Sequence, residues 1–193
     1  MGILNITWES LQKVLPPLDG KKIVDLGDQE FAYPLQYSGL SLRFAKNYYD
    51  LLGVSHVSID WHGKNGAFPV DMSKPIHASF DNRFDILTDF GFSEHVLDQY
   101  HNWKNVHDIM APGGLMIHEL PGQAMFPAHE TCFWYTPEFF EGLAEKQGYR
   151  VVEVRQQYHQ WHLSGWVTWV VLVKGDNLFM SPEEFLTLDL RRN

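Results

Sequence analysis

Short apolar runs alternate with longer amphipathic stretches in the first 148 residues of the chain. The runs are rich in Val, Ile, Leu and Phe, and each ends beside an acid or a glycine, which is typical of buried parallel strands. Five strands are expected in this part: Lys22–Leu26, His56–Ile59, Phe68–Asp71, Phe84–Thr88 and Leu115–His118. Because helical stretches separate most of the runs, we expect a largely parallel sheet.

The stretches between the runs carry apolar residues at helical spacing. The expected helices span residues 7–15, 40–52, 93–110 and 137–147, with a short one at 181–184. The fourth has the clearest boundaries, because Thr136 suits the N-cap, Pro137 the first helical position and Gly148 the end. His95 is expected to be a structural residue of the third helix.

After residue 148 the alternation stops. Two apolar stretches, Arg150–Gln157 and Trp166–Lys174, follow each other without a helix and predict an antiparallel pair at one edge of the sheet. The sequence therefore predicts an α/β fold with a doubly wound, Rossmann-like sheet of seven strands, mostly parallel with one reversed edge strand. We expect one domain, with a helix and linker at 1–19, the core at 20–175 and a C-terminal tail helix at 176–193.

The charge balance and the cysteine content narrow the functional classes. The 193 residues include 15 basic and 24 acidic ones, a net charge of −9, which disfavours a general nucleic-acid surface. Cys132 is the only cysteine, so no intramolecular disulfide can form, which fits a reducing compartment. The first ten residues lack the features of a signal peptide, and no apolar stretch reaches the ~20 residues that span a bilayer. We therefore expect a cytoplasmic protein that does not enter a membrane.

Acids at the ends of two expected strands suit a nucleoside pocket. The first strand ends in Asp25-Leu26 and is followed by Gly27, and the second is followed by Asp60. The carboxyl ends of neighbouring parallel strands open into one crevice, where an acid after the second strand can accept hydrogen bonds from both hydroxyls of a ribose. The pattern favours a cofactor of the adenosine type.

Six segments, in order and at plausible intervals over residues 20–175, resemble the motifs of the class I S-adenosylmethionine-dependent methyltransferases. They are Ile23–Gly27, Asp60–Trp61, Asp71–Met72, Phe84–Val96, Met110–His118 and Phe139–Val152. Asp60 matches the acid that holds the ribose, Trp61 the bulky side chain on the adenine, and Asp71 the acid that meets the adenine amino group. The resemblance implies S-adenosyl-L-methionine as the cofactor and ten residues that bind it: Asp25, Gly27, Asp28, Gln29, Asp60, Trp61, Asp71, Met72, Asp89 and Phe90.

The segment after Gly27 departs from that family. The family's first loop usually has glycines two and four positions beyond this residue, and here the places hold Gln29 and Phe31. Glycine allows close backbone approach and positive φ, whereas these residues put side chains into the same space. Two readings stay open: the cofactor is displaced, with Gln29 or Asp28 reaching its amino-acid end, or the pocket is blocked.

Candidate proton acceptors lie beyond the expected strand ends. His118 ends the fifth strand, and His129 and Glu130 lie in the long connection that follows it; the three are the expected catalytic residues. A metal site formed by these residues and Glu119 is conceivable, but the chain has no His-x-x-x-His helix pair and no pair of cysteines. We therefore expect no metal.

The resemblance implies a methyltransferase, and we expect it to methylate a small-molecule or glycan-type acceptor, at oxygen. The altered first loop supports an alternative, a non-catalytic binding or interaction subunit of the same fold. A nicotinamide oxidoreductase would also use an acid after the second strand, but its glycine fingerprint is missing. Aromatic residues near Trp134 suit a substrate wall, core packing or a homodimer contact equally well.

Overall fold

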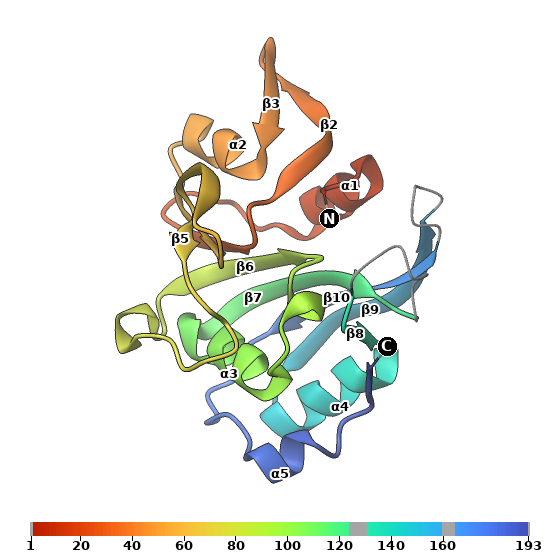
Figure 1. Ribbon diagram of the computed structural model, residues 1–193. Helices are drawn as coiled ribbons and strands as arrows, with labels where there is room; N and C mark the ends of the chain where they lie inside the picture. Colours follow the sequence, from red (N-terminus) through yellow and green to blue (C-terminus); the bar gives the residue numbers. More distant parts are fainter. Residues whose placement is uncertain (1, 124–130, 160–164, 193) are drawn as a thin grey trace.

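The computed structural model describes residues 2–123, 131–159 and 165–192. Its centre is a seven-stranded sheet with strand order β5-β4-β1-β6-β7-β10-β9 (Figure 1). In that order the strands are β5 (Phe68–Pro69), β4 (Ser55–Asp60), β1 (Lys22–Leu26), β6 (Phe84–Phe90), β7 (Met110–Pro121), β10 (Gly165–Val173) and β9 (Arg150–His159). The first five run parallel to one another, and β10 is antiparallel to both of its neighbours.

This architecture confirms the predicted fold class and the antiparallel pair at one edge. The inner strand of that pair, β10, is the reversed one, and β9 forms the edge. Strands β4, β1 and β6 end at Asp60, Leu26 and Phe90, so their carboxyl ends lie side by side at one border of the sheet.

Helices cover both faces of the sheet (Figure 1). Helices α1 (Asn5–Val14) and α2 (Ala45–Leu51) lie on one face, and α3 (Gln99–Ile109) and α4 (Pro137–Gln147) on the other. Alternate residues of each strand supply the two cores, as the period of a strand requires: Ile23 and Ile86 pack towards α1 and α2, whereas Val24 and Leu87 pack towards α3 and α4. The predicted helix at 137–147 is confirmed, with Thr136 as its cap and Gly148 in the left-handed region.

The predicted helix at 40–52 is wrong in its first part. Residues 30–44 form a hairpin of β2 (Glu30–Tyr37) and β3 (Leu40–Phe44), and α2 starts only at Ala45. The turn of the hairpin consists of Ser38 and Gly39, both with positive φ, as a tight two-residue turn requires. The segment from Leu40 to Phe44 alternates apolar and polar residues, and that period of two is the strand signal which the helical reading missed.

The predicted helix at 93–110 also starts later than expected. A 3₁₀ turn, η3 (Ser93–His95), comes first, and α3 begins only after Asp98, whose carboxylate accepts the backbone N–H of His101 at 3.0 Å. Two further 3₁₀ turns are η1 (Lys64–Gly66) and η2 (Ala78–Phe80).

The connection after β7 contains β8 (Phe133–Tyr135), which pairs with β11 (Leu190–Arg192), and the short helix α5 (Pro182–Phe185) precedes β11. Within the described ranges, the helices are all too short or too polar to cross a membrane.

Candidate functional site

Two adjoining cavities lie at the carboxyl ends of β1, β4 and β6. Each has a volume of about 300 Å³, and they share Trp61, Phe92 and His95 in their walls. The first cavity is lined by the loops after the three strands: Leu26, Gly27, Asp28, Gln29, Asp60, Trp61, His62, Phe90, Gly91, Phe92 and His95. The second is more apolar and is lined by Trp61, Val70, Asp71, Met72, Ser73, Phe92, His95, Val96 and Leu97. Together they form one crevice of the size of a small ligand pocket.

Gly27 makes the turn from β1 into the first cavity. Its φ is 80°, a conformation that favours glycine, and its N–H donates to the Ile59 carbonyl of β4 at 2.7 Å. A Cβ at this position would lie 3.3 Å from the ring of Phe92. The turn therefore needs glycine both for its backbone and for the close approach of Phe92.

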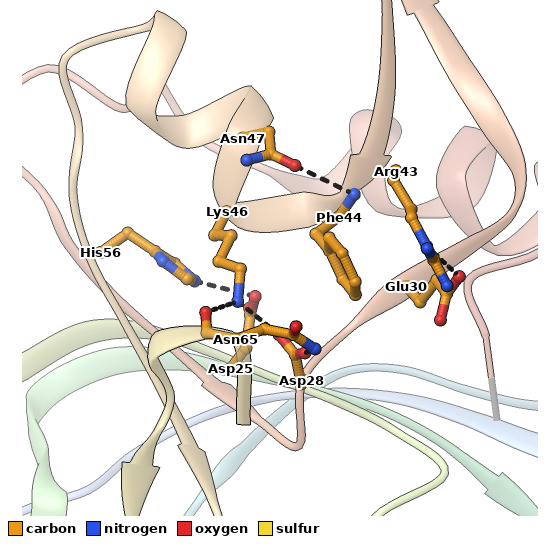
Figure 2. Close-up of polar contacts among 9 residues, drawn as sticks. All are labelled: Asp25, Asp28, Glu30, Arg43, Phe44, Lys46, Asn47, His56 and Asn65. Carbon is orange, nitrogen blue, oxygen red and sulfur yellow. Dashed lines mark hydrogen bonds and ion pairs between the residues drawn. The ribbon is translucent and has the colours of Figure 1, made fainter. Parts of the chain in front are cut away.

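Asp28 is held by a cation from α2. Lys46 Nζ lies 2.6 Å from its Oδ1, and the side-chain amide of Asn65 donates to its Oδ2 (Figure 2). Lys46 also donates to the backbone carbonyl of Asn65. The carboxylate thus ties the loop after β1 to α2 and to η1, and both of its oxygens have protein partners.

Gln29 occupies one of the two places where the family that the sequence resembles usually has glycine. Its side chain is buried, its amide nitrogen donates to the Leu26 carbonyl, and its Oε1 has no partner among the described residues. Phe31, at the second place, turns away from the cavity and packs edge-on against Trp8 of α1, with ring centroids 5.1 Å apart. Only Gln29 therefore contributes to the cavity wall, and a cavity persists beside it.

Asp60 and Trp61 follow β4 and face the same crevice. Oδ1 of Asp60 accepts the backbone N–H of His62 at 2.8 Å, which leaves Oδ2 without a partner among the described residues. Trp61 is 71% exposed and stacks on the ring of His62, with centroids 5.2 Å apart. A flat apolar surface thus lies next to a carboxylate that has a free oxygen.

Asp71 and Met72 lie in the wall of the second cavity. The hydrogen bond from Lys74 lowers the pKa of Asp71 to about 2, and bonds from the hydroxyl and backbone N–H of Ser73 add to the effect. Asp71 is therefore ionised at neutral pH. Met72 is buried and supplies an apolar surface beside it.

The fold of the chain has counterparts among solved structures. One is the 1,6-didemethyltoxoflavin-N1-methyltransferase of Burkholderia thailandensis with bound 1,6-didemethyltoxoflavin and S-adenosylhomocysteine, at a TM-score of 0.58 and 12% identity over 81% of this chain and 72% of that one. The fold is that of the S-adenosylmethionine-dependent methyltransferases. Two further examples come from Methanosarcina mazei (TM-score 0.56, 14% identity, 86% of this chain and 97% of that one) and Mesorhizobium loti (0.56, 13%, 86% and 97%).

The sequence comparisons are negative. The chain matches no protein-family model, and it matches no curated protein sequence. The topology agrees with the methyltransferase fold and differs from the dinucleotide-binding one, which has six strands in the order 3-2-1-4-5-6, because an antiparallel strand lies inside the edge of this sheet.

Asp25 and Asp89 lie behind the crevice of this methyltransferase fold and line neither cavity. Asp25 is buried, 2.8 Å from His56 Nε2, and it accepts the hydroxyl proton of Thr88. Asp89 is also buried, and it accepts the Ser93 hydroxyl at 2.6 Å and the backbone N–H of Phe92 at 3.1 Å. The two acids shape the loops, and Phe90, the neighbour of Asp89, is the residue that lines the first cavity.

Of the three expected catalytic residues the structure describes only His118, which lines neither cavity. His118 is fully buried, with Nδ1 3.1 Å from Asp89 Oδ2 and its ring centroid 5.0 Å from that of Trp103. It points to the α3 and α4 face of the sheet, and its Nε2 has no partner among the described residues. His129 and Glu130 lie outside the described residues.

Several residues of the crevice were missed or misread in the sequence, among them three with aromatic rings. His62 lines the first cavity, and Phe92 and His95 line both. The side chain of His95 is 40% exposed, although a structural role in a helix was expected for it. The late start of α3 explains the error, because η3 turns His95 towards the crevice. The available signal was the Glu-His-Val segment within a family motif.

The two described residues of the conceivable metal set lie on opposite faces of the sheet. His118 faces α3 and α4, whereas the neighbouring Glu119 faces α1, where the Thr7 hydroxyl donates to its Oε1 at 2.6 Å. The described residues include no cluster of three or more metal-binding side chains. Two consecutive strand residues point to opposite faces, so His118 and Glu119 cannot hold one ion.

Proposed function

We propose that the protein is an S-adenosylmethionine-dependent methyltransferase that acts on a small-molecule or glycan-type acceptor, at oxygen. The observation that carries the proposal is the crevice at the ends of β1, β4 and β6, in which one carboxylate oxygen of Asp60, next to Trp61, has no partner among the described residues. The fold gives independent support, because the structures that resemble this one are methyltransferases.

The residues of the crevice fit an adenosine-type cofactor. Asp60 offers an acceptor for ribose hydroxyls. The ionised Asp71, whose oxygens already bind Ser73 and Lys74, places a negative charge at the edge of the apolar second cavity, where an exocyclic amino group would lie. When bound, the cofactor would supply a methyl group on a sulfonium. The two cavities share the Trp61 wall, so one ligand can extend through both.

Methyl transfer to oxygen also requires a group that deprotonates the acceptor. An oxygen acceptor needs a base that removes its proton, and we propose His129 and Glu130 for this role. His118, the third residue expected from the sequence, is fully buried outside both cavities and is not proposed as the base. The net charge of −9 supports a small or neutral acceptor over a nucleic acid.

A turnover assay tests this proposal. The protein is incubated with S-adenosylmethionine and a panel of hydroxylated small molecules and glycans, and the products are read by mass spectrometry. We expect a gain of one methyl group on a hydroxyl acceptor, and we expect less turnover in His129→Ala and Glu130→Gln with cofactor binding retained. Methylation of amines alone would contradict the oxygen assignment.

A second candidate function is a non-catalytic binding subunit of the same fold. Gln29 supports it, because a buried side chain fills space at the first loop where the related family has glycine. This alternative predicts no methyl transfer to any acceptor, whether or not the crevice binds a nucleoside. Calorimetric binding without turnover across the whole panel would favour it.

A further inference from the structure

We propose that Gln29 reads the amino-acid end of the cofactor, with its side-chain carbonyl accepting a hydrogen bond from the α-ammonium group. The inference rests on the proposed function, since it assigns a role to one residue toward the same ligand. In this role Gln29, which stands where the family that the sequence resembles has glycine, would contribute to ligand selectivity.

The position of Gln29 follows from the layout of the two cavities. If a nucleoside placed its base in the second cavity and its ribose at Asp60, its 5′ substituent would extend into the rest of the first cavity. That part of the wall consists of the loop after β1 and the loop after β6. Gln29 lies in the first of these loops and is only 4% exposed.

The hydrogen bonds of Gln29 fix which of its atoms is free. Its amide nitrogen donates to the Leu26 carbonyl, an atom that can only accept, so the amide cannot be turned around. Oε1 is then the remaining polar atom, and it has neither a protein partner among the described residues nor contact with solvent. An unpaired buried acceptor is unfavourable, and a donor from a ligand would satisfy it.

The neighbouring acids are occupied by other partners. Both oxygens of Asp28 are bound by Lys46 and Asn65 (Figure 2), and those of Asp25 are bound by His56 and Thr88. Phe31, which replaces the second glycine, packs away from the cavity. Within the described part of this loop, Gln29 is therefore the side chain with an acceptor to offer.

A pair of ligands isolates this contact. S-adenosylhomocysteine carries the amino-acid end, and 5′-methylthioadenosine has the same nucleoside and a thioether but lacks that end. We expect Gln29→Met to weaken binding of S-adenosylhomocysteine about tenfold or more in calorimetry, since a hydrogen bond to a charged group is lost. Binding of 5′-methylthioadenosine is expected to stay within about twofold, because its contacts are unchanged.

Gln36→Met is the matched control. Gln36 lies on the exposed hairpin, where its side chain donates to the Pro34 carbonyl and the Ser41 hydroxyl, so the same substitution there should change neither affinity. Gln29→Gly serves as a second variant if the methionine variant does not fold, and the same selective loss is expected.

Three outcomes would overturn the inference. The first is an equal loss for both ligands, and the second is no loss for S-adenosylhomocysteine. The third is tighter binding of S-adenosylhomocysteine by Gln29→Gly, which would mean that Gln29 obstructs the amino-acid end. If the wild-type protein bound neither ligand, the proposed function itself would fail, and this inference with it.

Discussion

At the scale of single residues, Asp60 is the most direct link between the sheet and the proposed ligand. It ends β4, lines the first cavity and keeps one carboxylate oxygen free among the described residues. We expect Asp60→Ala to weaken binding of S-adenosylhomocysteine by about tenfold or more, because two hydroxyl donors lose their charged acceptor. Asp50→Ala, on the exposed side of α2, is the control in the same calorimetric titration, and equal affinities of the two variants would refute the ribose assignment.

Gly27 allows a second residue-scale test. Its φ of 80° and the 3.3 Å approach of Phe92 to a Cβ would both oppose Gly27→Ala, whereas Gly39→Ala, at φ 78°, has open space around the new methyl group. Both variants should lose about 1 kcal/mol of unfolding free energy from backbone strain, measured by denaturant titration. Ligand affinity should fall in Gly27→Ala alone, and a similar fall in both would argue against a special role for this turn.

The sequence predicted much of the crevice at this scale, because acids and glycines that follow parallel strands lie at the same border of the sheet. The sequence could not show which of the two side chains, Gln29 or Phe31, lines the cavity. The direction of each depends on a hairpin that was not predicted. Nor could the sequence place His118, since only the observed β-strand alternation shows that this ring faces α3 and α4.

At the scale of elements, the hairpin of β2 and β3 separates this chain from the expected pattern. A helix was predicted from Leu40 because the apolar residues that follow it fit both the helical period and the strand period. The tight turn at Ser38 and Gly39 pairs this segment with β2 as a strand. The hairpin delivers the chain to α2, whose Lys46 reaches back to Asp28 (Figure 2). One ion pair therefore connects α2 to the loop that forms the cavity wall.

Two methionine variants, one at Lys46 and a control at Arg43, test this connection. Lys46→Met leaves the mostly buried carboxylate of Asp28 without its cation, and we expect a loss of roughly 1–2 kcal/mol in unfolding free energy. Arg43→Met breaks the exposed pair with Glu30 and should change stability by less than about 0.5 kcal/mol. Chemical denaturation measures both, and equal effects would show that the Lys46 pair does not order the loop.

At the scale of the whole molecule, stability should depend on pH through buried carboxyl groups. Burial, and after it the charge of Asp89, raises the pKa of Glu94 to about 8, and burial raises the pKa of Glu119 to about 7. At a pH between 4.5, the ordinary pKa of a glutamate, and these raised values, the two carboxyl groups keep their protons in the folded protein and lose them in the unfolded chain. The unfolding free energy should therefore fall as pH rises through this window.

The variant Glu94→Gln isolates one of the two groups, because glutamine stays neutral at every pH. We expect its unfolding free energy to decline less steeply than that of the wild type from pH 5 to 8, the difference being at most about 1.4 kcal/mol per pH unit. Glu145→Gln, at an exposed position of α4, should keep the wild-type slope. Identical slopes in all three proteins would contradict a protonated Glu94.

The whole-molecule fold could be predicted because the alternation of strands and helices leaves few topologies for a chain of this size. The methyl acceptor could not be predicted from the sequence, because acceptor contacts in such a fold come from connecting loops rather than from the sheet.

The central claim is that the crevice at the ends of β1, β4 and β6 binds the methyl donor, and isothermal titration calorimetry tests it most directly. The wild-type protein is titrated with S-adenosylmethionine and with S-adenosylhomocysteine. The account predicts one site and a dissociation constant below about 1 mM for both ligands. Binding weaker than that for both would contradict it.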